Sequence, residues 1–330
     1  MRKHTSVQWR YKYSFESSSF YLSHLHYTSV KPINPTQTDS TCCTVMSQTK
    51  MSVTSMFDDL AATYETSTGG GTRDVARKLI DMLPPVGVNS SILDNACGNG
   101  IVAQELFSRY PDTPLSMICV DISKPMVDLA RRAVPPTTSA ATVSFDVVPS
   151  ENLSFLDETF THSITNMSMF FFSDPAKGAR EIYRTLKPGG TAIVTTWKYA
   201  GYLSVMREAQ KAVNPDVPLF DWPIADEWYQ ASCLKETLEK AGFKHIEMDT
   251  KKAHYAFSSL EETIRYLFGI FKAVGPKWSG EEDAEFQKQL LAIVKREAVT
   301  IKRPRSGKKD AEVVELVGLP MEAHVAVMNK

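Results

Sequence analysis

The sequence lacks the excess of one charge sign that marks many proteins of nucleic acids or membrane surfaces. Its 330 residues include 37 Lys and Arg and 38 Asp and Glu, for a formal net charge of −1. No apolar run approaches the roughly 18 residues that a membrane-spanning helix needs, and no clear signal peptide is present. We therefore expect a cytoplasmic protein with neither nucleic acid nor a membrane as a partner.

Cysteine is scarce, and none of the five cysteines has the spacing of a zinc site. This usage is typical of a reducing compartment, and it predicts no metal centre. The cysteines are Cys42, Cys43, Cys97, Cys119 and Cys233.

Acidic residues are nearly absent from residues 1–50, which contain only Glu16 and Asp39 but are rich in Ser, Thr and Tyr. No helical or strand period is evident there. The composition predicts a disordered N-terminal extension. The alternatives are a mitochondrial presequence and a mistaken start, with Met46 or Met51 as the initiator. We expect one folded domain over residues 51–330.

The most informative stretch present is Ser91–Gly100, in which an apolar strand ends near Asp94 and is followed by Gly98-Asn99-Gly100. The apolar pattern that begins at Ile101 predicts a helix. Glycine accepts positive φ and has no Cβ, so a ligand can lie against the backbone of such a turn. A strand, a glycine turn and a helix in this order are typical of a site for a nucleotide-like cofactor.

Asp94 discriminates between two kinds of cofactor. In a nicotinamide dehydrogenase the helix N-terminus faces a pyrophosphate, which an aspartate at the strand end would repel. S-adenosylmethionine instead carries an ammonium and a sulfonium, so that Asp94 has a cationic partner. The residues therefore favour S-adenosylmethionine, with an NAD(P)-dependent Rossmann oxidoreductase as the alternative.

Acidic residues also end the next two apolar runs. Asp121 follows residues 115–120 and can accept hydrogen bonds from both hydroxyls of a ribose. Ile122 is placed to pack on an adenine face. Asp146 ends the third run and can meet the adenine amino group, although Ser150 lies close enough in sequence to supply the same contact.

The order of these motifs resembles that of class I S-adenosylmethionine-dependent methyltransferases. Leu93-Asp94-x-x-Cys97-Gly98-x-Gly100 is similar to the first motif of that family, and Val120-Asp121-Ile122-Ser123-x-x-Met126 is similar to the second. Asp146 with Glu151-Asn152-Leu153 resembles the third motif, but the acid lies farther from Glu-Asn-Leu than in the family pattern. The adenine contact is therefore left open among Asp146, Val147 and Ser150.

Two later stretches, Phe160–Asn166 and Lys187–Trp197, resemble methyltransferases of fungal secondary-metabolite clusters, a group that includes the gliotoxin-pathway N-methyltransferase. The resemblance implies a set of cofactor-binding residues, which we expect to be Tyr64, Asp94, Ala96, Gly98, Gly100, Asp121, Ile122, Met126, Asp146, Val147 and Asn166.

Methyl transfer mainly requires alignment of the nucleophile and exclusion of water, and a general base is needed only when the acceptor must lose a proton. The acceptor pocket is expected after the fifth strand, and His254 and Asn166 are the candidate catalytic residues. The candidate pocket residues are Trp197, Tyr199, Phe268 and Trp278.

Strands and helices alternate through the centre of the chain, which predicts an α/β fold with helices on both faces of a mostly parallel sheet. The resemblance implies a Rossmann-like sheet of seven strands with the last one antiparallel, and a helical insertion at about 255–300 that caps the substrate. We expect a helix over about 281–300 and a solvated basic loop over 302–309, for which a nuclear signal is the alternative. Strands are expected near 91–95, 115–121, 142–147, 161–167, 191–197, 244–250 and 323–328.

The sequence thus predicts an enzyme that transfers a methyl group from S-adenosylmethionine to an oxygen or nitrogen of a small secondary metabolite derived from a polyketide, terpenoid or peptide. We expect a monomer or a homodimer. Besides the oxidoreductase, a regulatory protein that keeps the methyltransferase fold without catalysis remains an alternative.

Overall fold

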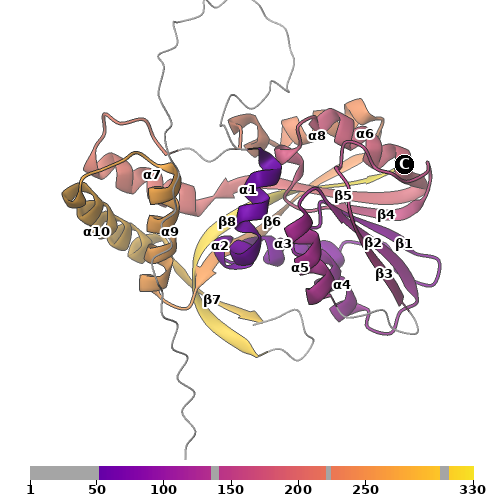
Figure 1. Cartoon of the computed structure of the whole chain (residues 1–330), viewed down its shortest axis with the longest axis horizontal. Helices are drawn as coiled ribbons and strands as arrows, with labels where there is room; N and C mark the ends of the chain where they lie inside the picture. The colour runs from indigo at the N-terminus through magenta and orange to yellow at the C-terminus, as the bar shows by residue number, and fades with distance from the viewer. Residues whose placement is uncertain (1–51, 135–140, 221–223, 305–311) are drawn as a thin grey trace, which may run out of the picture. The chain divides into compact units, whose positions relative to one another are not determined.

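The computed structural model of the chain describes residues 52–134, 141–220, 224–304 and 312–330. The extension predicted over residues 1–50 lies outside these described residues. A single sheet runs through the described part of the chain, with helices packed against it (Figure 1).

The described residues form eight strands, and their order in the sheet is the feature that places the functional site. The strands are β1 (Ser91–Asn95), β2 (Leu115–Asp121), β3 (Ala141–Val147), β4 (Phe160–Thr165), β5 (Leu186–Ala200), β6 (Ile246–Phe257), β7 (Val299–Pro304) and β8 (Val313–Asn329). They are ordered β3-β2-β1-β4-β5-β8-β6, with β7 paired to β8. The pairs from β3 to β5 are parallel, and β8 is antiparallel to β5 and to β6. The predicted Rossmann-like sheet with an antiparallel last strand is confirmed.

The central strands are buried because helices cover both faces of the sheet. In β1 every residue but the first is buried, which is typical of parallel strands. Figure 1 shows α3, α4 and α5 on one side of the sheet and α6 and α8 on the other. The helices are α1 (Val53–Leu60), α2 (Tyr64–Ser67), α3 (Gly71–Ile80), α4 (Ile101–Arg109), α5 (Lys124–Ala133), α6 (Pro175–Thr185), α7 (Gly201–Val213), α8 (Ala231–Ala241), α9 (Leu260–Val274) and α10 (Gly280–Glu297).

The extra strand β7 corrects two predictions. The helix expected to reach residue 300 ends at Glu297, and Val299 and Thr300 already pair with β8. The basic run expected to be a loop begins inside this strand, where Arg303 is buried. Both differences arise because β-branched residues favour strands and the long β8 offers a partner that lies far away in the sequence. The sheet therefore has eight strands rather than seven.

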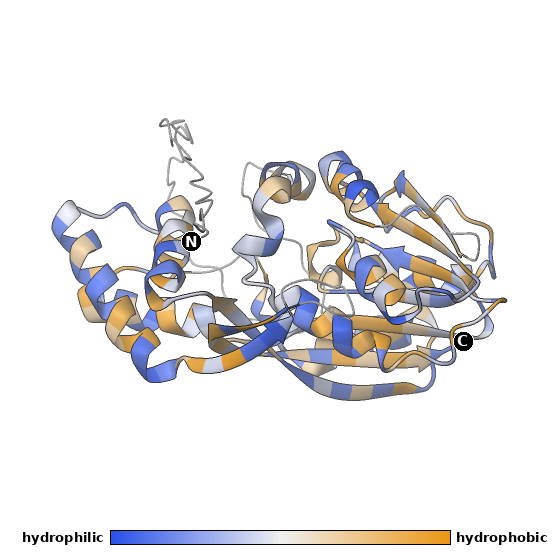
Figure 2. Ribbon diagram, turned by 90° about the horizontal axis from the view of Figure 1, so that it is seen from below, coloured by the Kyte–Doolittle hydropathy of each residue, from blue (hydrophilic) through white to orange (hydrophobic). Residues whose placement is uncertain are grey.

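The helical insertion packs beside the sheet as its own layer. α9 and α10 pack against each other and against α7, a helix that the sequence did not predict. The rings of Phe271 and Phe286 stack at 4.0 Å at the centre of this layer. Figure 2 shows the helices with hydrophobic and hydrophilic residues alternating along them, as amphipathic helices do.

Candidate functional site

The ends of β1, β2 and β4 lie at one edge of the sheet, because parallel strands in register end together. Asp94 of β1 pairs with Cys119 of β2 and with Ile164 of β4, one to two residues before those strands end. In an open α/β sheet, ligands bind outside the carboxyl ends of the strands. The loops that follow these three strands are therefore the expected walls of a site.

Asp121 joins the first two of these loops. The backbone N–H of Gly98 donates a hydrogen bond to Asp121 Oδ2 at 2.8 Å, and the N–H of Ser123 donates one to Oδ1 at 2.9 Å. Gly98 has a φ of +54°, which glycine adopts at little cost. The Asp121 side chain is 7% exposed, and burial raises the pKa of its carboxyl while the backbone donors lower it.

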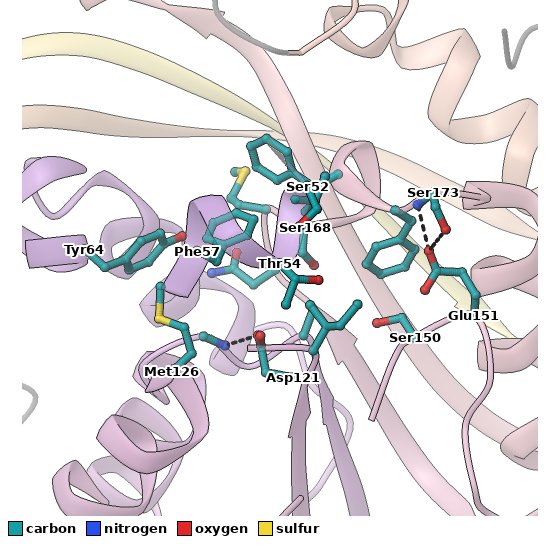
Figure 3. Close-up of a pocket in the computed structure, with 18 residues that line it drawn as sticks. Ser52, Thr54, Phe57, Tyr64, Asp121, Met126, Ser150, Glu151, Ser168 and Ser173 are labelled. Carbon is teal, nitrogen blue, oxygen red and sulfur yellow. Dashed lines mark hydrogen bonds between the residues drawn. The ribbon is translucent and has the colours of Figure 1, made fainter. Parts of the chain in front are cut away.

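A cavity of about 250 Å³ opens at this edge, and 18 residues line it. Figure 3 shows Tyr64 and Met126 at one end, Ser150 and Glu151 at the other, and Asp121 between them. The structure therefore brings together most of the residues predicted to bind the cofactor. Those that line the cavity are Tyr64, Ala96, Gly98, Asp121, Ile122, Met126 and Asn166.

The other four predicted cofactor residues do not line the cavity. Gly100 packs against α5, where an added Cβ would meet the Ala130 Cβ at 2.9 Å. The exposed Asp146 accepts a hydrogen bond from the N–H of Val147 at 2.8 Å, and Val147 is itself exposed. The buried Ser150 takes a place in the cavity wall instead. Of the three residues left open for the adenine contact, only Ser150 lines the cavity.

Asp94, the fourth, is 1% exposed and lies near the end of β1, shortly before the glycine turn. Neither of its carboxylate oxygens has a hydrogen-bond partner among the described residues. Burial, together with the neighbouring charge of Asp121, raises the pKa of Asp94 to about 8. The backbone N–H of Ala103 favours the charged form, but a buried carboxyl is costly to ionise, so the environment shifts Asp94 toward its neutral form in the ligand-free protein.

Aromatic side chains form another wall of the cavity. The rings of Phe57 of α1 and Phe171 pack edge to face with their centroids 5.1 Å apart, and the centroid of the Tyr64 ring lies 6.2 Å from that of Phe57. Phe172 also lines the cavity. The sequence prediction did not include Phe171 or Phe172, although an aromatic run directly after the fourth predicted strand was a signal that could have identified them.

Asn166 connects the cavity to the neighbouring elements. Its Nδ2 donates to the carbonyl of Thr72 at 3.2 Å, and the Thr195 hydroxyl donates to its Oδ1 at 3.0 Å. Tyr64 forms a side-chain hydrogen bond with Thr72, and burial raises the pKa of its hydroxyl well above the usual range. Tyr64 is therefore a neutral hydroxyl at physiological pH.

The residues predicted for acceptor binding and catalysis lie outside this cavity, with Asn166 as the exception. His254 belongs to β6, with Nδ1 4.0 Å from Asp74 of α3, and burial lowers its pKa. Trp197 is buried in the core, whereas Tyr199 is exposed. Phe268 and Trp278 pack in the helical insertion.

Two further observations concern the described residues alone. They contain no group of three or more His, Cys, Asp or Glu side chains that could hold a metal ion. No helix among them is long and apolar enough to cross a bilayer.

Comparison with known proteins identifies the fold and its cofactor. A family model described as a methyltransferase domain matches residues 93–194, the span that carries the glycine turn, Asp121 and Asn166. The chain is an S-adenosylmethionine-dependent methyltransferase. The resemblance predicted from the motifs is thereby confirmed.

Curated relatives of the methyltransferase come from fungi and bacteria. It is 29% identical over 219 residues to methyltransferase tpcH of Aspergillus fumigatus, covering 62% of this chain and 75% of the relative. It is 31% identical over 191 residues to methyltransferase ucsB of Acremonium sp, and the match covers 55% of this chain and 65% of that relative. It is 33% identical over 146 residues to the ubiquinone/menaquinone biosynthesis C-methyltransferase UbiE of Geotalea daltonii. This match covers 42% of this chain and 60% of that relative.

Among solved structures, the methyltransferase is similar in fold to the [4+2]-cyclase SpnF. The TM-score is 0.50 at 18% sequence identity, and the match covers 85% of this chain and 97% of SpnF. This likeness concerns the fold only.

The raised pKa of Asp94 leads to a prediction for the pH dependence of stability. Its folded pKa of about 8 exceeds the value of 3.8 expected for an unfolded chain, so the folded protein holds one more proton between these pH values. This group therefore lowers the free energy of unfolding as pH rises from about 4 to 8. We expect Asp94→Asn, which has no carboxyl to ionise, to stabilise the ligand-free protein more at pH 8.5 than at pH 5. Urea unfolding at both pH values measures this difference; an equal effect at the two would show that Asp94 is ionised at neutral pH.

Proposed function

We propose that this cavity binds S-adenosylmethionine, and that the enzyme transfers the methyl group to an oxygen or nitrogen of a small secondary metabolite derived from a polyketide, terpenoid or peptide. The observation that carries the proposal is the buried carboxylate of Asp121, which lies in the cavity wall between the glycine turn and Ile122.

The residues present fit the ribose and adenine parts of the cofactor. A carboxylate has about four acceptor sites, and the N–H groups of Gly98 and Ser123 use two of those on Asp121. The remaining acceptor sites suit a pair of ribose hydroxyls. Ile122 is 40% exposed and offers an apolar surface to a flat base, and Ser150 offers a hydroxyl at the far end of the cavity.

Asp94 and Gly98 fit the methionine part. The unpartnered carboxyl of Asp94 near the turn would supply negative charge to an ammonium group, which in turn would lower the Asp94 pKa. At Gly98, an added Cβ would lie 4.0 Å from the Tyr64 ring, so the backbone there is open to close approach. When bound, S-adenosylmethionine would supply a methyl group on a sulfonium, which is a good leaving group.

The side chains of the cavity favour an acceptor that is already nucleophilic. Its ionisable lining residues are Tyr64, Asp121 and Glu151, and none of the 18 described lining residues is Lys, Arg or His. Glu151 Oε1 accepts hydrogen bonds from the backbone and hydroxyl of Ser173 at 2.7 and 2.9 Å. Orientation and exclusion of water are therefore the chief contributions of the chain.

The acceptor itself is proposed to be neutral and largely apolar. The aromatic wall of Phe57, Phe171 and Phe172 suits an apolar ring system, and the absence of cationic lining residues gives no partner to a phosphate. Two relatives are named for other acceptor atoms, the C-methyltransferase UbiE and the acetylaranotin bis-thiomethyltransferase of Aspergillus terreus. The experiment must therefore distinguish methylation of an oxygen or nitrogen from methylation of a carbon or sulfur.

The ribose assignment predicts a strong effect at Asp121. We expect Asp121→Ala to weaken binding of S-adenosylhomocysteine by at least about tenfold, because one lost charged hydrogen-bond partner costs about 1.5–3 kcal/mol. Asp146→Ala is the matched control and should bind as the wild type does, because Asp146 does not line the cavity. Calorimetry measures both dissociation constants. Equal affinity in the Asp121 variant and the wild type would refute the assignment.

The transfer reaction is tested with labelled S-adenosylmethionine and a panel of phenols, carboxylic acids, amines, thiols and activated carbon acids. We expect the label on oxygen or nitrogen of an aromatic acceptor, identified by mass spectrometry of the product. Label on carbon or sulfur alone would overturn the proposed acceptor atom. Bound cofactor without transfer to any compound would favour the regulatory alternative, and tight NADPH binding without S-adenosylhomocysteine binding would contradict the cofactor.

A further inference from the structure

Arg73 does not line the cavity, but its side chain binds residues from two of the segments that do. It belongs to α3 and is 5% exposed. Its guanidinium donates to Glu65 in a bidentate manner, from Nε at 2.5 Å and from Nη2 at 2.8 Å. It also donates from Nη1 to Glu105 Oε1 at 2.8 Å and from Nη2 to Gln104 Oε1 at 3.0 Å.

The partners of Arg73 belong to two segments that are far apart in the sequence and that each contribute to the cavity wall. Glu65 directly follows Tyr64, whose ring lies in the cavity wall. Gln104 belongs to α4, and its Nε2 donates to the carbonyl of Asn99 in the glycine turn at 3.1 Å. A continuous series of hydrogen bonds thus runs from the segment that carries Tyr64, through Arg73, to the turn that carries Gly98.

Apart from this link, Ala61 is the only buried residue of the segment Val53–Ser67. No residue of α1 is buried. The Ser123 hydroxyl donates to Asp58 at 2.6 Å, and Phe57 packs on Phe171. A segment with few buried contacts opens locally at a small cost in free energy. The bidentate pair with the nearly buried Arg73 is the strongest polar contact that anchors it.

We propose that Arg73 is a positioning residue that couples the segment Val53–Ser67 to the glycine turn, so that cofactor binding at the turn and closure of this segment over the cavity stabilise each other. The inference rests on the proposed cofactor site. Lysine cannot replace arginine here, because one ammonium cannot hold Glu65 in a bidentate manner and also bond Glu105 and Gln104.

The experiment compares wild type, Arg73→Lys and Arg77→Lys by calorimetry and by hydrogen exchange, with and without S-adenosylhomocysteine. Arg77 is the matched control, because it donates to the other oxygen of Glu105 at 3.1 Å from the same helix. In the wild type the ligand should slow exchange in both residues 53–67 and the glycine turn. In Arg73→Lys the turn should still be protected and residues 53–67 should not, with a dissociation constant raised about tenfold. Arg77→Lys should remain within about twofold of the wild type.

Other results separate the inference from the proposed function. Protection of residues 53–67 and unchanged affinity in Arg73→Lys would overturn the inference, as would equal losses in Arg77→Lys. Failure of the wild type to bind S-adenosylhomocysteine would instead overturn the cofactor site. If Arg73→Lys does not fold, Glu65→Ala decides, since Glu65 is half-exposed and leaves Arg73 paired with Glu105. If the ligand no longer slows exchange of residues 53–67 in Glu65→Ala, the coupling is supported. If protection and affinity in Glu65→Ala equal those of the wild type, the coupling is overturned.

Discussion

The functional edge of this methyltransferase depends on the carboxylate of Asp121, which accepts hydrogen bonds from the backbone of two loops. The loops follow adjacent parallel strands, and each leaves N–H groups that have no partner within the sheet. By accepting from Gly98 and Ser123, Asp121 fixes the glycine turn relative to the start of α5. The cavity is therefore organised by a group that also keeps acceptor capacity for a ligand.

The two buried side chains Arg73 and Asp94 differ in whether an opposite charge lies beside them. Arg73 is buried but has two carboxylate partners, Glu65 and Glu105, so its charge is compensated within the protein. Asp94 is buried without an opposite charge beside it, and burial raises its pKa. The charge of Arg73 is thus used in ion pairs within the protein, whereas the Asp94 carboxyl has no cationic partner in the ligand-free protein. An uncompensated buried acid is unfavourable for stability and is understandable where a cationic ligand completes the site.

Local sequence signals predicted the parts of the fold that depend on local patterns. The bounds of β1 and β2 agree with prediction, because each is a short apolar run that ends at polar residues. The glycine turn and Asp121 could be identified for the same reason. The prediction of β7 failed because that strand exists through pairing with β8, a contact that no local pattern contains.

Most residues predicted to bind the cofactor line the cavity, whereas most of those predicted to bind the acceptor lie outside it. Motif position placed Asp146 near the adenine contact, but alternate side chains of a strand face opposite sides, and Asp146 lies on the exposed end of β3. Aromatic residues expected to line a pocket, such as Trp278, pack within the helical insertion instead. Hydrophobicity alone does not distinguish a core aromatic from one in a cavity wall. Phe171 illustrates the reverse case, since it lines the cavity without having been predicted.

A crystal structure of the protein with S-adenosylhomocysteine bound tests the central claim most directly. The account predicts the ribose hydroxyls within hydrogen-bond distance of the Asp121 carboxylate, the adenine between Ile122 and Ser150, and the ammonium group on the side of Asp94. A ligand bound elsewhere, or one that leaves Asp121 in contact with the protein backbone alone, would contradict it.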